Sequence, residues 1–363
     1  MKRGTYLKIK QLGAIIISWL IIGFFIAVYD YLVLHTHVSM GPAANYSFLI
    51  SILRNMGAGL IGGLLGGSIL VFYVNEKFND KPYGYTILIV GTCFIFIILL
   101  ITLIMGVTIV PWQTGRPLAD PMTKKAFFDF VTDSYPLKNG LVWAFIVSLT
   151  QLLLQVSSKF GHQTFLNIIT GKYNVPKKEK RIFMFLDLNS STSIAEQLGN
   201  ETYHALLKDF FADITYPILE NKGNIYQYVG DEVVIAWNYK DGIENTQCLK
   251  CFFDIKMAID KKRQKYIERY DLIPTFKAGI HSGNVIAGEI GIIKRDITYS
   301  GDVLNTTSRI LGKCGELNQE LIISSDLLSM LNVAKSYQSK ILGHIPLKGK
   351  QHSVPIHALL QMK

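Results

Sequence analysis

Two aspartates lie where a site for metal ions and a phosphate could form. Asp187 follows a continuous apolar run at 182–186, which predicts a buried strand. Asp231 lies in a tight turn between two further predicted strands, 224–229 and 232–237. Neighbouring antiparallel strands could bring both carboxylates to one edge of a sheet. Paired carboxylates there suit hard cations such as Mg²⁺ or Mn²⁺.

A polar loop after Asp187 adds a possible anion site. A helix is predicted from Ser193, with Glu196 three residues later as a capping box. Free backbone N–H groups at a helix start bind anions, and two cations can activate an attacking oxygen and hold a phosphate. Two interpretations stay open: a metal–triphosphate site, or ordinary strand-end and turn aspartates. The loop residues expected to bind substrate are Leu188, Asn189, Ser190, Ser191 and Thr192.

Strands and helices alternate around these residues. Helices are expected at 193–198, 203–219, 245–270, 303–314 and 326–331. Strands are expected at 182–186, 224–229, 232–237, 274–281, 285–290 and 321–324, with a last hairpin within 345–360. The strands 274–281 and 285–290 are expected to pair across Ser282 and Gly283. This order predicts an α+β sandwich of ferredoxin-like type with additions.

Four short segments resemble the successive motifs of the class III adenylate and guanylate cyclases. They read FLDLNSST at 185–192, YVGDE at 228–232, AGIHSG at 278–283 and GDVLNTTSRI at 301–310. They occur in the family's order with similar spacing, and the resemblance covers about residue 181 to the C-terminus. Each motif alone is weak evidence, but four in order are highly specific.

The resemblance implies roles for particular residues. Asp187 and Asp231 match the two metal-binding aspartates, which implies two Mg²⁺ or Mn²⁺ ions. Asn305 matches the asparagine that orients the ribose, and Arg309 matches the arginine that stabilises the transition-state phosphate. A spacing of four puts the last two on one helix face. The triphosphate-binding lysine matches Lys348, with Lys350 as the competing assignment.

The choice of base departs from the usual pattern. The family's adenylate cyclases typically read adenine with a lysine and an aspartate or threonine, and these positions hold Gln227 and Thr298 here. Threonine is a known variant, whereas glutamine is less usual and can both donate and accept. A guanylate cyclase would be expected to carry glutamate at the first position. Adenine is therefore favoured, with guanine as the alternative.

The implied reaction is cyclisation of ATP to 3′,5′-cyclic AMP and pyrophosphate by attack of the ribose 3′-oxygen. The protein's task is positioning and charge stabilisation. The family's sites lie between two catalytic domains, so a chain with one such domain is expected to act as a homodimer. A catalytically silent nucleotide-binding module is the competing function. The full set of Asp187, Asp231, Asn305 and Arg309 argues against it.

The first half of the chain predicts a membrane domain. The 363 residues are 49% hydrophobic with a mean hydropathy of +0.27, and the apolar content is concentrated before about Ser157. Four stretches, 12–34, 48–74, 86–110 and 140–156, are long enough to span a bilayer as helices. Apart from Arg54 these spans lack paired intramembrane charges, so a transporter is unsupported. We therefore expect a four-helix transmembrane bundle at 1–156, a connector at 157–181 and the catalytic domain at 182–363.

Basic residues predict the orientation. The N-terminus carries Lys2, Arg3, Lys8 and Lys10, whereas the loop 35–47 has neither lysine nor arginine. Both termini and the catalytic domain are therefore expected in the cytoplasm of a plasma or bacterial inner membrane. The loop 111–139, expected outside, carries Arg116, Lys124, Lys125 and Lys138, a mild conflict with this rule.

Three further features have simple interpretations. The net charge of +10 sits largely in clusters beside apolar segments, which favours anionic lipid over nucleic acid as a partner. The four cysteines include one CxxC pair, Cys248 and Cys251, without a second pair, which favours reduced structural thiols over zinc. Gly59, Gly63 and Gly67 form a stripe of small residues that serves either packing within one bundle or a dimer seam.

Overall fold

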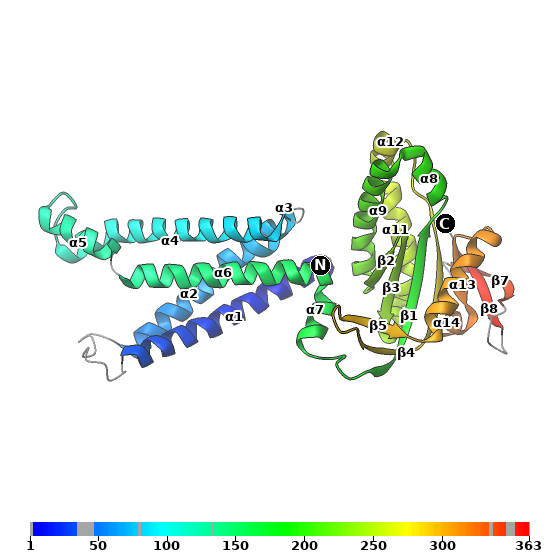
Figure 1. Cartoon of the computed structure of the whole chain (residues 1–363), viewed down its shortest axis with the longest axis horizontal. Helices are drawn as coiled ribbons and strands as arrows, with labels where there is room; N and C mark the ends of the chain where they lie inside the picture. Colours follow the sequence, from blue (N-terminus) through cyan, green and yellow to red (C-terminus); the bar gives the residue numbers. More distant parts are fainter. Residues whose placement is uncertain are drawn as a thin grey trace. The chain divides into compact units, whose positions relative to one another are not determined.

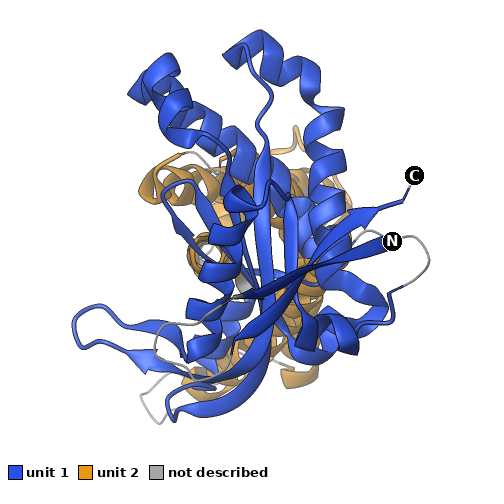
Figure 2. Ribbon diagram, turned by 90° about the vertical axis from the view of Figure 1, so that its right-hand side faces the viewer, with its two compact units in different colours: residues 1–4, 163–363 blue, residues 5–162 orange. Residues whose placement is uncertain are grey.

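The computed structural model describes residues 3–34, 47–78, 81–132, 134–333, 337–345 and 353–362. The chain forms two compact units, Thr5–His162, and Gln163–Lys363 together with Met1–Gly4 (Figure 2). Each unit has its own core, so each is described by itself.

The N-terminal unit is helical. Its elements are α1 (Arg3–Leu34), α2 (Phe48–Ile69), a π-helical turn (Leu70–Val74), α3 (Asn75–Lys77), α4 (Tyr83–Thr114), α5 (Pro121–Thr132) and α6 (Ser134–Phe160). Four helical stretches in the described part are long and apolar enough to cross a membrane: Arg3–Val33, Phe48–Lys77, Tyr83–Thr114 and Lys138–Phe160. They overlap the four predicted stretches. The first of them contains Asp30, which is 8% exposed and forms an ion pair with Lys138 at 2.5 Å, so the expectation that the spans lack paired charges apart from Arg54 is wrong.

The glycine stripe packs α2 against α1. A Cβ added at Gly59 would lie 2.6 Å from the carbonyl oxygen of Trp19, and one at Gly63 would lie 3.1 Å from the Cα of Ile16. Small residues are required where helix backbones approach this closely. The interpretation as packing within one bundle is therefore confirmed.

The C-terminal unit contains a mixed sheet. Its strands are β1 (Lys177–Leu188), β2 (Asn224–Val229), β3 (Glu232–Asn238), β4 (Phe276–Ile290), β5 (Asp296–Ser300), β6 (Leu321–Ser324), β7 (Tyr337–Ile345) and β8 (Val354–Gln361). They lie in the order β2-β3-β1-β4-β6-β8-β7, with β5 paired to β4. Only β4 and β6 pair in parallel among the described strands. The first four strands in this order give the ferredoxin-like arrangement that the sequence predicts.

Helices cover both faces of the sheet (Figure 1). The helices from His162 onward are α7 (His162–Ile169), α8 (Ser191–Leu198), α9 (Asn200–Glu220), α10 (Tyr239–Ile243), α11 (Gln247–Lys261), α12 (Arg263–Tyr270), α13 (Asp302–Glu316) and α14 (Ser325–Met330), of which α9 and α11 cover one face and α13 the other. Alternate residues of β1 point to opposite faces. Ile182, Met184 and Leu186 pack in the core with α9 and α11, whereas Phe183 and Phe185 pack with α13.

One predicted turn is wrong. Phe276–Ile290 is a single 15-residue strand that runs through Ser282 and Gly283, and its hairpin partner is β5, which the sequence pattern did not predict. Gly283 serves close packing, because a Cβ there would lie 3.0 Å from the Cβ of Val303 on α13. The glycine therefore marks a helix contact and not a change of chain direction.

The cysteines agree with a structural role. Cys248 and Cys251 are fully buried free thiols on α11. Burial raises the pKa of Cys248 to about 12, so it stays protonated and unreactive at neutral pH.

Candidate active site

The structure brings Asp187 and Asp231 to one edge of the sheet. Asp187 is the last but one residue of β1, opposite Glu232 of β3 and Lys277 of β4. Asp231 lies in the turn between β2 and β3, where Gly230 adopts a positive φ of 63°. The juxtaposition that the sequence predicts is therefore present, and it comes from the pairing of β1 with the β2–β3 hairpin.

The acidic groups at this edge disfavour one another's charge. Partial burial, together with the negative charge of Asp231, raises the pKa of Asp187, while Lys277 opposes this shift. Burial and then the charges of Asp187 and Asp231 raise the pKa of Glu232 to about 7. A cation bound here would neutralise this negative charge and so favour the ionised form of the half-buried carboxyl groups.

The donor set fits Mg²⁺ or Mn²⁺. No three metal-ligating side chains of the described residues gather around one point, so the donors here are the aspartate pair. Mg²⁺ in phosphate-processing sites is commonly held by one or two carboxylates, with water and substrate phosphates completing its shell. The aspartate pair supplies the two carboxylates of that pattern.

Lys277 was not singled out by the sequence analysis. Its Nζ lies 3.2 Å from Oδ2 of Asp187 across the β1–β4 pairing. Both side chains are about three-quarters buried, with 25% and 22% exposed. Only the register of two strands far apart in sequence brings them together, so no local pattern could have identified it.

The loop after Asp187 is anchored from a neighbouring segment. The backbone N–H of Asn189 donates to the carbonyl of Thr275 at 2.9 Å, and its side-chain amide donates to Thr275 Oγ1 at 3.2 Å. Ser190 adopts a left-handed conformation with φ 55°. The segment before β4 therefore holds the loop in place.

The predicted capping box is wrong. The helix α8 begins at Ser191, two residues before the expected start at Ser193, and no side chain caps it. Ser193 and Glu196 are exposed residues inside the helix. The N–H groups of its first turn, near Ser191 and Thr192, consequently have no side-chain acceptor at the N-cap.

Asn305 and Arg309 lie on the side of α13 that faces away from its own sheet. The opposite side packs inward: a Cβ at Gly279 of β4 would lie 2.5 Å from the backbone nitrogen of Leu311, and Val303 is buried against Gly283. Helical spacing places Asn305 and Arg309 roughly half a turn from these contacts. Asn305 is exposed and Arg309 is half-buried. The helix therefore presents this pair away from the sheet that carries Asp187.

Gln227 lies on β2 and Thr298 on β5. The residues next to them in sequence bring these two strands into contact. Gln227 is exposed on β2, beside an irregularity in the β2–β3 pairing. Thr298 lies on β5 opposite Gly288, and its buried hydroxyl oxygen has no hydrogen-bond partner among the described residues. The adjacent rings of Tyr226 and Tyr299 lie 5.0 Å apart, which joins the two strands. Lys348 and Lys350 lie outside the described residues.

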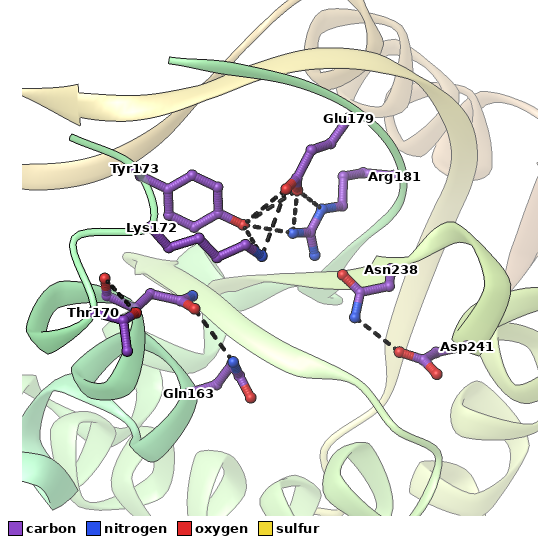
Figure 3. A network of polar contacts seen from close by, with 9 residues as sticks. Gln163, Thr170, Lys172, Tyr173, Glu179, Arg181, Asn238 and Asp241 are labelled. Carbon is purple, nitrogen blue, oxygen red and sulfur yellow. Dashed lines mark hydrogen bonds and ion pairs between the residues drawn. The ribbon is translucent and has the colours of Figure 1, made fainter. Parts of the chain in front are cut away.

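A polar network joins the end of the connector to β1 (Figure 3). Tyr173 is 1% exposed, and its hydroxyl accepts from Arg181 at 2.9 Å and donates to Glu179 at 3.2 Å. Nε of Arg181 also donates to Glu179 at 2.9 Å, and the guanidinium lies 5.2 Å from the centre of the Tyr299 ring. Residue 173 is thus fixed to the catalytic unit by its own polar contacts.

Comparison with known proteins identifies the family. Residues 174–361 match the adenylate and guanylate cyclase catalytic domain. This match covers more than half of the 363 residues, and the chain therefore belongs to that family.

Two curated relatives and one solved structure show the extent of the similarity. The chain is 36% identical over 225 residues to adenylate cyclase 2 of Rhizobium meliloti (strain 1021), which covers 62% of each protein. It is 28% identical over 182 residues to an adenylate cyclase of Anabaena cylindrica, covering 48% of this chain and 35% of that one. A bacterial light-regulated adenylyl cyclase shares the fold with a TM-score of 0.52 at 17% identity, over 63% of this chain and 67% of that one. The chain thus spans less than two thirds of the length of these curated relatives.

Proposed function

We propose that this protein is an adenylate cyclase, which converts ATP to 3′,5′-cyclic AMP and pyrophosphate. The observation that carries the proposal is the convergence of Asp187 and Asp231 beside a loop that Thr275 anchors, in a chain of the cyclase family. The two curated relatives above are both called adenylate cyclases, which favours ATP as the substrate.

In this proposal Asp187 and Asp231 hold two Mg²⁺ or Mn²⁺ ions. Bound ions of this kind stabilise negative charge on the phosphates and lower the pKa of a nearby hydroxyl. The free N–H groups at the start of α8 and the loop residues Leu188 to Thr192 cradle phosphate oxygens. Lys277 contributes a positive charge at the same place and becomes available to a phosphate when a cation takes over Asp187.

Asn305 and Arg309 act on the sugar and the reacting phosphate. Asn305 orients the ribose, and Arg309 offers fixed N–H donors to the charge that develops at the α-phosphate. Because α13 presents both residues away from its own sheet, they complete the site of a second catalytic domain. The working unit is accordingly a homodimer with two equivalent shared sites.

The reaction needs positioning more than covalent catalysis. The ribose 3′-oxygen forms a bond to the α-phosphorus, the bond from that phosphorus to the bridging oxygen breaks, and the electron pair leaves with pyrophosphate. The 3′-hydroxyl proton is released to solvent, and we assign no side chain as general base. Holding the two ends of one substrate in line removes most of the entropy cost of such a step.

Gln227 and Thr298 are the proposed readers of the base. The buried and unpartnered hydroxyl of Thr298 can accept from or donate to an adenine edge, and Gln227 can do either. Neither position carries an acid that would pair with the guanine N–H groups. Lys348, or Lys350 in its place, is proposed to bind the triphosphate from the segment before β8.

Turnover of each nucleotide tests the proposal. The purified full chain in detergent is given ATP or GTP with Mg²⁺ or with Mn²⁺, and cyclic nucleotide and pyrophosphate are quantified. We expect cyclic AMP as the major product and no turnover without a divalent cation. Faster formation of cyclic GMP at matched concentration would indicate a guanylate cyclase, and nucleotide binding without product would indicate a silent module.

We also propose that the four apolar helical stretches form a transmembrane bundle at 1–156, joined by the connector 157–181 to a cytoplasmic catalytic domain at 182–363. The basic N-terminus supports an inside location for both ends. In the loop expected outside, Lys138 is paired with Asp30 at 2.5 Å and Arg116 lies 3.6 Å from Asp120, so two of its cations have acidic partners. Protease protection of a C-terminal tag in sealed vesicles tests this topology.

A further inference from the structure

A second pocket opens in the catalytic unit beside the segment that leads into β4. It has a volume of about 350 Å³ and is lined by α11, the first residue of α12, residues 273–276 and Glu320. Phe276 begins β4 opposite Leu188, the residue that follows Asp187, so the pocket lies at the aspartate end of the sheet. None of the described residues that the proposed function assigns to the nucleotide or the metal ions lines it. We call it the α11 pocket.

The inner lining of the α11 pocket is apolar. The rings of Phe252 and Phe276 are buried, and their centroids lie 5.3 Å apart. Ile259 is 3% exposed, and Ile273 is half-buried beside Pro274. Pockets of a few hundred Å³ with such a lining typically bind small organic molecules. The α11 pocket therefore suits a ligand with an apolar body.

Four charged side chains also line the α11 pocket, and two of them already form a pair. Nζ of Lys256 on α11 lies 2.5 Å from a carboxylate oxygen of Glu320, the residue before β6. The other two are Asp260 and Arg263, three positions apart where α11 ends and α12 begins. Within the described part of the chain, the side chains of Asp260 and Arg263 form neither a hydrogen bond nor an ion pair, with each other or with other residues.

This unused pair of opposite charges determines which ligand is complementary. The guanidinium of Arg263 can donate two parallel hydrogen bonds to a carboxylate, and the carboxylate of Asp260 can accept from an ammonium group. A simple anion would be repelled by Asp260, and a simple cation would be repelled by Arg263. Only a ligand that carries both charges is attracted by both side chains.

One residue connects the α11 pocket to the substrate loop. Thr275 lines the pocket, and its carbonyl oxygen accepts from the backbone N–H of Asn189 at 2.9 Å. Its Oγ1 accepts from the side-chain amide of Asn189 at 3.2 Å. A ligand packed against residues 273–275 would restrain the anchor of the loop. Since ordering a loop in advance lowers the entropy cost of binding there, an occupied pocket should favour nucleotide binding.

We propose that the α11 pocket binds a small zwitterion with an apolar body, of the class of the apolar α-amino acids. Its carboxylate contacts Arg263, its ammonium group contacts Asp260, and its body packs against Phe252 and Ile273. Binding at this site is independent of the proposed function. The effect on nucleotide binding rests on the proposed function, because it acts through the loop that holds the phosphates.

Fluorine NMR of para-fluoro-L-phenylalanine tests the site. The full chain in detergent is titrated with this probe, and broadening of the probe signal that unlabelled L-phenylalanine reverses reports specific binding. Arg263→Gln and Asp260→Asn should each raise Kd by about tenfold or more, because each removes a hydrogen bond between charged groups. Lys261→Gln is the matched control and should leave Kd unchanged, since that lysine is exposed on the same helix and does not line the pocket.

Two analogues of the probe test the charge argument. Para-fluorophenylacetate lacks the ammonium group and para-fluorophenethylamine lacks the carboxylate, so both should bind more weakly than the amino acid. Equal Kd values for the wild type, Arg263→Gln and Asp260→Asn would overturn the proposal. Tighter binding of either analogue, absence of broadening that L-phenylalanine reverses, or displacement of the probe by ATP would overturn it as well.

Cyclic AMP formation on the same samples separates the pocket from the function. Saturating L-phenylalanine should lower KM for ATP by about twofold to tenfold in the wild type and in Lys261→Gln, but not in Arg263→Gln. A chain that cyclises ATP without binding the probe refutes the pocket assignment alone. A chain that binds the probe through Asp260 and Arg263 but forms no cyclic nucleotide refutes the proposed function alone. Probe binding with an unchanged KM refutes the link through Thr275.

Discussion

At the residue scale, burial and neighbouring negative charge raise the pKa of Asp187 and of Glu232 at the aspartate end of the sheet, where Lys277 lies beside Asp187. Such a cluster lowers folding stability until a cation binds. In the proposed function, a strand end, a turn and a neighbouring strand together build the site for a metal–triphosphate complex.

Asp187→Asn should abolish most turnover without unfolding the protein. The amide keeps the side chain's shape but removes a charged ligand. Metal stabilisation of phosphate charge contributes several kcal/mol, so the loss should be about a hundredfold or more. Asp271→Asn is the matched control, because that residue is exposed in a left-handed turn where asparagine is well tolerated. Equal activity of both variants would contradict the metal assignment.

Lys277→Met should raise KM for ATP and lower kcat/KM by about tenfold to a hundredfold, because a charged contact to phosphate is lost. Lys277→Arg should recover much of this loss, since it restores the charge. Steady-state kinetics of the two variants show whether the positive charge at position 277 contributes to ATP binding. If methionine and arginine behave alike, the lysine serves packing and not phosphate binding.

Glu232→Gln should change the pH dependence of stability. The pKa of Glu232 is raised from 4.5 to about 7 in the folded protein. Between these values the folded state keeps a proton that the unfolded state releases, so the free energy of unfolding falls as pH rises. Because glutamine does not titrate, the free energy of unfolding of the variant does not fall in this way. Its melting temperature in chelator should exceed that of the wild type near pH 7 and match it near pH 4, whereas a constant difference would exclude this cause.

At the element scale, the close contact between β4 and α13 positions Asn305 and Arg309. Gly279→Ala should destabilise the protein by about 1–3 kcal/mol, because the new Cβ meets backbone atoms of α13 that cannot yield easily. A displacement of about an ångström can cost on the order of a hundredfold in rate, so turnover should fall as well.

Gly312→Ala provides the control within the same helix. An added Cβ there meets nothing within 4 Å. Alanine should raise stability by up to about 1 kcal/mol through helix propensity, with turnover unchanged. Thermal unfolding and cyclic AMP assays on both variants distinguish the effect of the close β4–α13 contact from the effect of helix propensity. Similar behaviour of the two would show that the β4–α13 approach is not what limits the site.

Local patterns predicted most elements but not the details that depend on distant partners. The apolar run before Asp187 and the tight turn at Asp231 identified three strands and the sheet edge at which both aspartates lie. By contrast, Gly283 resembles a turn in sequence, and only its contact with Val303 shows that it lies in mid-strand. Lys277 was missed for the same reason, since its ion pair with Asp187 depends on strand register. The helix start at Ser191 was missed because no side chain caps it.

At the scale of the whole molecule, the proposed function gives one chain both halves of a site that two chains must assemble. The aspartates lie at the edge of the sheet, and the Asn305–Arg309 face of α13 points away from that sheet. The pairing of two chains would bring each face to the other's aspartates. A connector fixed to β1 by Tyr173 and Arg181 could then control turnover by shifting one catalytic unit against the other.

Complementation between two inactive variants tests the shared site most directly. Asp187→Ala and Asn305→Ala chains carry different affinity tags, are produced separately and together, and heterodimers are isolated by sequential purification. Each variant alone should be inactive. The heterodimer should recover up to half of the wild-type rate per dimer, because one of its two sites contains only wild-type groups. Heterodimers that form and remain as inactive as the single variants would contradict a cyclase site shared between two chains.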